Sequence, residues 1–561
     1  MQNAYIRELY DQAIIDSIVY EGEIYFNPKK CWQESKVHII SFLPPVARRI
    51  DPGFTEKWEN LGANSVAGYL RAKGIKTTRI CYSVGDIVSE KIFLEGITSH
   101  KNPELRLIGI SAFTSEIPYT KELVTKIRNA YSEKVRLILG GAHASSLDVW
   151  QSEVRDLLNY FDFIVVGEGE ETLFELAQHL ETSGSEKPLQ IRGLIFKDNG
   201  KPFFTGTRSR FEIKSAEFPI PKVMDRESGF FPLPPDIKRF ASIESSRGCP
   251  HDCTFCPNKK IWGRQLTIDS VSHVPYKFIS PERTAELMEE DFIDRESNYF
   301  FFHDSWISPL FLEQLSNELI KRDLGDKIHW AFMSTVKDFY NPKKREVKTG
   351  LLKLIRKAGC FQITYGVETV NEEIGVSFNK PIPRSISELV LKETFDAGIF
   401  PAIFLIIGEP EETEANLNEL KEFMKESFAL RFRISCCYPF FGSALREEVD
   451  RKNLWLSEVH KQHEFATTST PVLKSQFIMN EYGTINQGRL KILEQFEEEA
   501  LREVYSSEQY QSKLLQFAKQ HDAGDMVKGW IYLLGKIWLL ETPISLDDER
   551  NISNGRREKN G

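Results

Sequence analysis

The stretch Glu244-Ser245-Ser246-Arg247-Gly248-Cys249-Pro250-His251-Asp252-Cys253-Thr254-Phe255-Cys256-Pro257-Asn258 places three thiols within eight residues, beside glycine and proline residues that favour turns. The spacing Cys-x3-Cys-x2-Cys offers a metal centre three thiolates, with no fourth cysteine in the loop. A cubane iron–sulfur cluster takes one ligand at each of its four irons. The loop therefore predicts a [4Fe–4S] cluster held by Cys249, Cys253 and Cys256, with one iron open to a small molecule.

Two alternatives account for three neighbouring thiols without such a cluster. A structural zinc site needs a fourth cysteine or histidine to complete its tetrahedron. His251 lies inside the first gap of the loop, and its reach to a shared tetrahedral centre is poor from there. The other alternative is three unrelated buried thiols. The tight spacing favours the cluster over both.

The loop resembles the cluster loop of the radical S-adenosylmethionine (SAM) superfamily, in its three cysteines and in the aromatic Phe255 just before the last of them. This resemblance implies that SAM coordinates the open iron. It also implies a barrel of parallel strands surrounded by helices, in which the chemistry takes place at the C-terminal ends of the strands.

Composition limits the class of protein. A chain of 561 residues is too long for one compact core and predicts about three or four structural units. Its net charge of −9 gives no electrostatic reason to expect nucleic acid as a partner. The N-terminus shows no secretory signal, and the longest apolar run, 530–540, is too short for a membrane span. We therefore expect a cytoplasmic protein, in which eight cysteines, three of them clustered, favour metal binding over disulfides.

Strand and helix patterns alternate over residues 37–180, after a lead-in over residues 1–36. Strands are expected at 37–42, 77–82, 105–111, 135–139 and 163–166. This alternation predicts an α/β domain with a doubly wound, Rossmann-like sheet, whose ligands lie beyond the carboxyl ends of the strands. Two of these ends are rich in glycine, 140–145 and 167–170, which lets a bulky group approach the backbone.

These two glycine loops, placed about one hundred residues before the cysteine loop, resemble the cobalamin-binding domain of the cobalamin-dependent (class B) radical SAM enzymes. The resemblance implies that cobalamin is contacted by Ser111, Thr114, Gly140, Gly141, His143, Ser145, Gly167, Glu168 and Gly169. The Asp-x-His-x-x-Gly motif of other cobalamin proteins is absent, so no histidine is expected on the lower face of the cobalt. For His143, a hydrogen-bonding role within the loop is the alternative to a cofactor contact.

Residues 181–236 predict a hairpin around Asp198-Asn199-Gly200, followed by an extended proline-rich linker. A second alternation, over 237–445, then predicts six parallel strands at 241–245, 299–303, 328–333, 362–367, 402–407 and 433–438. Ser280-Pro281 and a capping box at 385–388 indicate two helix starts. The expected fold is a partial (β/α)6 TIM-type barrel, open on one side, which is also the radical SAM fold. Residues 446–561 predict a mainly helical domain.

Polar residues at the ends of the barrel strands are the candidates for holding SAM. By resemblance, the residues beside SAM are Phe255, Asn258, Ser334, Thr335, Glu368 and Gly408. The family's usual Gly-Gly-Glu after the second strand is absent, and for His303 and Asp304 a solvated strand-end role is the alternative to a functional one. Cys436 and Cys437, on the sixth strand, are expected to be buried structural thiols.

Together the resemblances imply a cobalamin-dependent radical SAM enzyme that methylates an unactivated carbon of a small-molecule or natural-product substrate. In such enzymes one electron, from a donor such as flavodoxin or ferredoxin, cleaves SAM to a 5′-deoxyadenosyl radical. That radical abstracts hydrogen from the substrate, and methylcobalamin supplies the methyl group.

Three alternatives differ from this reading. A rearrangement, ring-contraction or cyclisation enzyme would use the same cofactors without methyl transfer. A non-catalytic cobalamin carrier or sensor is the alternative from a different class. A methylthiotransferase is disfavoured, because it would carry a second cluster on N-terminal cysteines and only Cys31 and Cys81 precede the loop.

Overall fold

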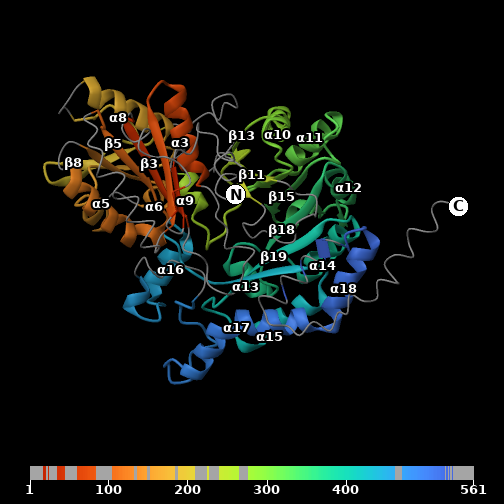
Figure 1. Ribbon diagram of the computed structural model, residues 1–561. Coiled ribbons are helices and arrows are strands. Elements are labelled where there is room, and N and C mark those ends of the chain that lie inside the picture. Colours follow the sequence, from red (N-terminus) through yellow and green to blue (C-terminus); the bar gives the residue numbers. More distant parts are fainter. Residues whose placement is uncertain are drawn as a thin grey trace.

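The chain forms two sheets of mostly parallel strands that stand side by side (Figure 1). The computed structural model describes residues 17–20, 23–24, 35–43, 60–83, 104–131, 135–147, 152–182, 187–208, 224–225, 239–263, 276–461 and 470–524, together with 526, 527, 530 and 534. Cys31 and the prolines of the linker lie outside these residues. Both sheets agree with the α/β fold class expected from the sequence.

The first sheet has nine strands in the order β2-β1-β4-β3-β5-β6-β7-β8-β9. Strands β1 to β7 pair in parallel, apart from β2, whereas β8 and β9 run antiparallel at the far edge. The strands are β1 (Ser17–Tyr20), β2 (Glu23–Ile24), β3 (Val37–Leu43), β4 (Thr77–Ser83), β5 (Leu107–Ser111), β6 (Arg136–Gly140), β7 (Phe163–Val165), β8 (Leu194–Asp198) and β9 (Lys201–Phe204).

Helices cover both faces of this sheet, as a doubly wound fold requires. They are α3 (Leu61–Ala72), α5 (Ile117–Tyr131), α6 (Gly141–Ser146), α7 (Ser152–Leu157) and α8 (Glu170–Thr182). Successive side chains of β3 point to opposite faces: Ile39 packs in the core that contains α3 and α8, and Ile40 packs in the core that contains α5 and α7. The register aligns Ser111 with Gly140, which brings two predicted site residues to the same edge.

The predicted hairpin forms, but it does not stand apart with the linker. Asn199 and Gly200 both have left-handed backbone, with φ of 49° and 75°, as a tight two-residue hairpin turn requires. Because β8 pairs with β7, the hairpin extends the first sheet. Strands β1 and β2, within the predicted lead-in, extend its other edge. Burial of the β8 side chains Leu194 and Ile195 explains the attachment.

The second sheet has the order β10-β11-β14-β15-β18-β19-β20, and the six strands after β10 are parallel. The strands are β10 (Met224–Asp225), β11 (Arg239–Ile243), β14 (Tyr299–Phe302), β15 (His329–Ser334), β18 (Cys360–Glu368), β19 (Phe400–Ile407) and β20 (Arg431–Cys436). Within the described residues β11 and β20 are not paired, so the barrel stays open as predicted. Cys436 and Cys437 are buried, in agreement with a structural role.

Helices α10 (Pro281–Arg295), α11 (Pro309–Lys321), α12 (Thr349–Lys357), α14 (Arg384–Asp396) and α15 (Glu414–Glu426) lie outside the barrel. Ser280 caps α10 as predicted, accepting a hydrogen bond from Arg283 N, and Pro281 follows it. The capping box predicted at Ser385 is wrong, because α14 begins one residue earlier after Pro383, with no side-chain cap. The extended backbone of Pro383 leads directly into the helix.

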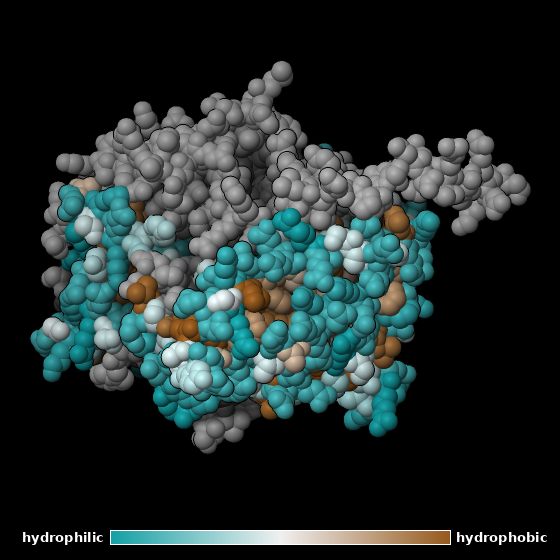
Figure 2. Space-filling view, turned by 90° about the horizontal axis from the view of Figure 1, so that it is seen from below, coloured by the Kyte–Doolittle hydropathy of each residue, from teal (hydrophilic) through white to brown (hydrophobic). Residues whose placement is uncertain are grey.

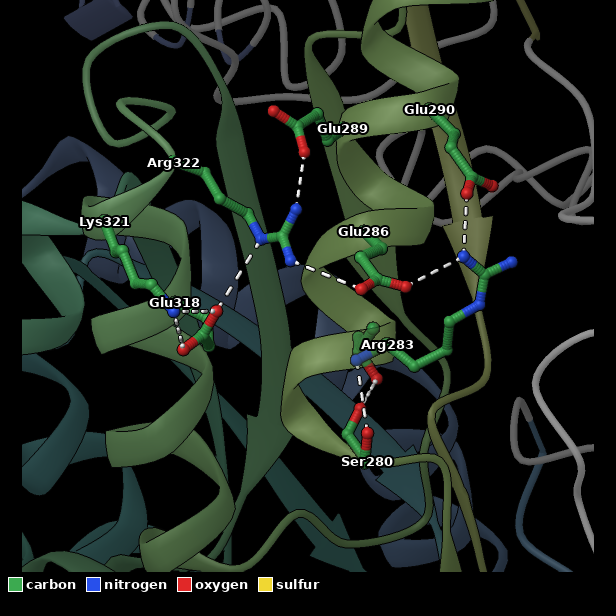
Figure 3. A network of polar contacts seen from close by, with 9 residues as sticks. Ser280, Arg283, Glu286, Glu289, Glu290, Glu318, Lys321 and Arg322 are labelled. Atoms are coloured by element: carbon green, nitrogen blue, oxygen red, sulfur yellow. Dashed lines mark hydrogen bonds and ion pairs between the residues drawn. The ribbon is translucent and has the colours of Figure 1, made fainter.

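Ion pairs connect α10 to α11 on the outer surface (Figure 3). Arg322 Nη1 of α11's C-cap lies 2.6 Å from Glu289 Oε2, and Arg322 Nη2 lies 3.5 Å from Glu286 Oε1. Arg283 Nη1 contacts Glu286 at 3.0 Å and Glu290 at 2.7 Å. Pairs this exposed contribute little individually, so the apolar core between helices and strands provides most of the stability here.

The C-terminal helices α17 (Gln487–Ser506) and α18 (Glu508–Gln520) pack against the barrel. Their apolar residues, including Leu493, Phe496 and Phe517, belong to the same core as β19 and β20. The underside of the molecule, where α15 and α17 lie in Figure 1, is mostly hydrophilic, with hydrophobic residues in small groups (Figure 2). Within the described chain, no helix combines the length and apolar character that crossing a bilayer requires.

Candidate functional site

The cysteine loop leaves the barrel after β12 (Ser246–Arg247), and a left-handed backbone at Gly248, φ 100°, turns the chain there. It ends at α9 (Asn258–Gly263). Cys249, Cys253 and Cys256 are all partly exposed, and none of them forms a disulfide with another described cysteine. In the described part of the chain, no group of three or more Cys, His, Asp and Glu side chains is arranged to hold a single metal ion. A cubane binds its thiolates at separate irons.

The loop is fixed to the barrel by Thr254. Its amide donates to Phe378 O at 3.0 Å, its hydroxyl donates to Ser377 O at 2.8 Å, and its carbonyl accepts from Leu445 N at 2.9 Å. Phe255, predicted to lie beside SAM, packs edge-on against Phe378 with ring centroids 5.0 Å apart. The structure thus accounts for Phe255 by packing that holds the loop in place.

Burial determines the protonation of the thiols. It raises the pKa of Cys249 to about 11 and that of Cys256 to about 12. Burial also raises the pKa of Cys253, an effect that the positive charge of Lys380 partly offsets. Without metal the thiols are therefore protonated at neutral pH, and binding iron has to release protons.

Two predicted SAM residues at strand ends make defined polar contacts. Glu368, at the end of β18, lies 2.8 Å from Lys380 Nζ and is 8 % exposed. Ser334, at the end of β15, donates to Asp338 Oδ2 at 3.2 Å. The hydroxyl of Thr335 is buried and has no hydrogen-bond partner among the residues that the structure describes, which suits a site that takes up a polar ligand group.

Gly408 has left-handed backbone, φ 78°, after β19, and its amide donates to Glu412 Oε2 at 2.6 Å. Burial raises the pKa of Glu412 to about 8. The amide of Gly408, which was predicted to lie beside SAM, therefore already donates its hydrogen to the carboxyl group of Glu412.

Asp304 and His303 were expected to be either functional or solvated strand-end residues. Both form hydrogen bonds with other residues of the protein. Asp304 is 1 % exposed and accepts hydrogen bonds from Ser245 N at 3.1 Å, from Ser245 Oγ at 2.8 Å, and from Ser246 Oγ. His303 Nε2 lies 3.0 Å from Ser242 Oγ. A solvated role is wrong for Asp304, because β14 ends inside the barrel; the residue supports the start of the cysteine loop.

A cavity of about 280 Å³ lies at the carboxyl ends of the first sheet. The predicted cobalamin residues that line it are Ser111, Gly140, Gly141, Ser145, Gly167, Glu168 and Gly169. Its apolar walls include Ile39, Ile138, Val165 and Leu173. From the barrel side, Glu244, Arg247, Asn258, Ile261, Trp262 and Ser305 line it. Asn258, predicted to lie beside SAM, thus borders the cavity of the first domain.

One glycine of the lining is required by the close packing of the backbone around it. A Cβ on Gly141, whose φ is 90°, would lie 2.7 Å from Ala112 N and 2.8 Å from Ser111 Oγ. Ser145 joins the two glycine loops, because its hydroxyl accepts from Gly167 N at 3.0 Å and donates to Gly141 O at 2.9 Å. A large flat group with polar edges, such as cobalamin, fits these glycine and apolar walls.

His143 and Thr114 are not brought to this cavity. His143 Nδ1 lies 3.1 Å from Thr114 Oγ1, and His143 Nε2 lies 3.2 Å from Glu153 Oε1. The His143 side chain is fully buried. The structure favours the hydrogen-bonding alternative for His143, because both ring nitrogens face protein groups.

Sequence reasoning missed several residues at the cavity. Asn60 caps α3 by accepting from Ala63 N at 2.9 Å, and it donates to Ser111 Oγ at 3.2 Å. Its position just before an amphipathic helix was the available signal. No local pattern indicated Arg247 and Glu170, because these two residues contact each other although they lie far apart in the sequence.

Two family models match the chain: the B12 binding domain over residues 54–177 and the radical SAM superfamily over residues 243–424. An anaerobic magnesium-protoporphyrin IX monomethyl ester cyclase from Cereibacter sphaeroides is 24% identical over 365 residues, 64% of this chain and 55% of the relative. The chain therefore spans just over half the length of that relative. An uncharacterized methyltransferase from Pyrococcus horikoshii is 27% identical over 379 residues, 67% of this chain and 75% of the relative.

Among solved structures, the radical SAM methyltransferase TsrM from Kitasatospora setae, with cobalamin and a [4Fe–4S] cluster bound, has a similar fold. Its TM-score is 0.56 at 14% identity, covering 80% of this chain and 87% of that one. The expected cofactor set is confirmed as cobalamin, SAM and a [4Fe–4S] cluster. A B12-binding domain is therefore followed in one chain by a radical SAM domain, which is the domain order that the sequence predicts for a cobalamin-dependent radical SAM enzyme.

Proposed function

We propose that this enzyme methylates an unactivated carbon of a small-molecule or natural-product substrate. The observation that best supports the proposal is the cavity, whose walls come from the glycine loops of the first domain and from the short helix α9. Asn258 lines the cavity only two residues after Cys256. The sites proposed for the two cofactors are therefore adjacent.

The cysteines and the cavity residues have separate tasks in this proposal. When bound, the cluster and SAM supply an organic radical, and cobalamin supplies the methyl group. Cys249, Cys253 and Cys256 hold the cluster. Thr335 and the Glu368–Lys380 pair offer a hydroxyl, an anion and a cation to the polar groups of SAM. Trp262 and the apolar walls keep water away from a reactive radical.

An electron must reach the cluster from outside. The three cysteines are partly exposed, which supports a cluster near the surface and within reach of a one-electron carrier such as flavodoxin or ferredoxin. Free thiols persist in a reducing compartment, so we place the enzyme in the cytosol.

A cyclisation or rearrangement is the second candidate function. It is favoured by the identity with an anaerobic cyclase, which is close to the identity with the methyltransferase. Both reactions would use the same two domains, and the two candidates differ in whether a methyl group enters the product.

The test is anaerobic reconstitution of the full chain with iron, sulfide and hydroxocobalamin, followed by incubation with dithionite as the electron donor, methyl-deuterated SAM and a small-molecule extract of the source cells. Methyl transfer predicts formation of 5′-deoxyadenosine together with a product that gains one deuterated methyl group. Deoxyadenosine with an unlabelled new product indicates the second candidate. Absence of both deoxyadenosine and bound cobalamin contradicts the proposal.

Two variants separate the sites. Cys256→Ala should keep cobalamin binding and lose SAM cleavage. Gly109→Leu should lose cobalamin binding and keep the iron–sulfur cluster. A Cβ on Gly109 would point between Ile39 and Leu173, which line the cavity. Loss of both properties in both variants would contradict two separate sites.

A further inference from the structure

The guanidinium of Arg247 is buried between the two sheets and bonds to both of them. On the barrel side, Nε lies 2.8 Å from Glu244 Oε2. On the side of the first sheet, Nη1 lies 3.0 Å from Glu168 Oε1 and 2.9 Å from Glu170 Oε1, and Nη2 donates to Ser65 Oγ at 3.1 Å. We call Arg247 and these four partners the Arg247 cluster.

The partners on the first sheet also bind one another. Ser65, on α3, donates its hydroxyl hydrogen to Glu170 Oε1 at 2.6 Å. Glu170 begins α8, and Glu168 lies between Gly167 and Gly169 of the second glycine loop. The side chains of Arg247, Glu168 and Glu170 are at most 4 % exposed. The cluster thus joins α3, the glycine loop and α8 to the barrel.

The planar guanidinium of Arg247 lets one side chain contact three carboxylates at once. Burial by itself would lower the pKa of Arg247, but attraction to Glu170, Glu244 and Glu168 raises it well above its ordinary value. Burying ions costs free energy that good geometry only partly offsets. The planar fork of arginine reaches several acceptors at once, whereas lysine presents a single point charge.

The position of Arg247 in the chain gives the cluster its significance. Only Gly248 separates Arg247 from Cys249, and Glu168 lies beside two glycines that line the cavity. A change in the distance between Arg247 and Glu168 therefore moves the start of the cysteine loop relative to the second glycine loop. Glu168, Glu170, Glu244 and Arg247 themselves line the cavity.

We infer that Arg247 is a positioning residue, which sets the distance between cobalamin and the iron–sulfur cluster by holding the glycine loop at 167–170 and the cysteine loop in one buried ion cluster. This inference rests on the cofactor sites of the proposed function. A residue that only stabilised the fold would leave the separation of the cofactors unchanged in any variant that still folds.

The chain contains a matched control for this arginine. Arg208 also binds α8, with Nη1 at 3.0 Å from Glu171 Oε2 and Nε donating to Thr172 Oγ1 at 3.1 Å. These partners belong to the first sheet's own helix, and none of the three residues lines the cavity. Arg208→Lys therefore weakens a clamp on the same helix without touching the connection to the barrel.

The decisive measurement is the magnetic interaction between paramagnetic Co(II) and the reduced cluster, by pulsed electron paramagnetic resonance on full-length reconstituted protein with hydroxocobalamin as the added cobalamin. Wild type and Arg208→Lys should give the same narrow distance distribution. Arg247→Lys and Glu168→Gln should broaden or shift it by more than the difference between wild type and Arg208→Lys. An unchanged distribution in both variants overturns the inference.

A second measurement needs no cofactor. Amide hydrogen exchange over 165–170 and 244–249 of the apo-protein should become about tenfold faster or more in Arg247→Lys, as expected for loss of a hydrogen bond between charged groups. It should stay at the wild-type rate in Arg208→Lys. Equal exchange in wild type, Arg247→Lys and Glu168→Gln overturns the inference.

The two measurements keep the inference separate from the proposed function. If wild type binds neither cobalamin nor iron, the proposed function fails, and hydrogen exchange still decides whether Arg247 joins the loops. If Arg247→Lys does not fold, Glu168→Gln decides, because the amide keeps an oxygen acceptor and the size of the side chain while it removes the charge.

Discussion

Lys380 Nζ lies 2.8 Å from Glu368 Oε1, and this ion pair stands beside the cysteine loop. Glu368 has left-handed backbone, φ 65°, at an irregularity in the pairing of β18 with β19. Gly366 leaves the space for the pair, because a Cβ there would lie 2.4 Å from Glu368 Oε1 and 2.6 Å from Lys380 Nζ. Burial by itself would lower the pKa of Lys380, but the charge of Glu368 and the hydrogen bond to its carboxylate raise that pKa above its ordinary value.

Lys380→Met should destabilise the barrel. It leaves Glu368 buried without its cation, and breaking a buried pair in this way costs about 3–5 kcal/mol. Urea unfolding of the apo-protein at pH 7 measures the loss. The control is Lys337→Met, on an exposed residue, which should change the unfolding free energy by less than about 0.5 kcal/mol. Equal unfolding midpoints for the two variants would contradict a structural role for the pair.

The stability of the barrel should depend on pH through Asp304. Burial raises the pKa of this carboxyl to about 7, from 3.8. Between these values the unfolded chain is ionised while the folded one keeps its proton, so stability falls as pH rises and levels off above pH 7. The expected slope is about 1.4 kcal/mol per pH unit.

This slope is measured as the unfolding free energy of wild type minus that of Asp304→Asn, from pH 5 to pH 8. Asparagine cannot ionise, so the difference isolates Asp304 from the other titrating groups. A difference that does not vary with pH would show that the hydrogen bonds from Ser245 and Ser246 keep the carboxylate ionised in the folded protein.

Two adjacent glycines should respond differently to the same substitution. Gly141→Ala forces a Cβ against Ala112 and Ser111 at a φ of 90°, and should cost about 1–3 kcal/mol and reduce cobalamin affinity. Gly140→Ala has φ −135° and its nearest contact at 3.9 Å, and should change stability by less than about 1 kcal/mol. Urea unfolding and optical titration with hydroxocobalamin check both; equal effects would contradict a tight fit at Gly141.

Iron binding should depend on the loop cysteines alone. After anaerobic reconstitution, Cys256→Ala should retain background iron only, because three thiolates are the protein's full donor set. The matched control is Cys360→Ala, whose thiol is buried within β18. Colorimetric iron and sulfide assays check this. Iron retained by Cys256→Ala, or lost from Cys360→Ala, would point to a different site.

Local patterns were sufficient to predict most strands of the two large sheets. The apolar run at 37–42 predicts β3 to within one residue, because burial on both faces of a parallel strand requires it. The Asn199-Gly200 turn was readable because its left-handed backbone suits those two residues. The attachment of the hairpin to the first sheet could not be predicted from local sequence, because it depends on which sheet edge is free to pair with β8.

The sequence by itself determined that three thiols, two glycine-rich strand ends and two strand–helix alternations occur in this order. Only the tertiary structure decided that Glu168 meets Arg247, 79 residues away, while His143 turns toward Thr114 and Glu153. The physical reason is that backbone conformation and burial periodicity are encoded by near neighbours, whereas ion pairs and cavity walls depend on which surfaces the two packed sheets bring into contact.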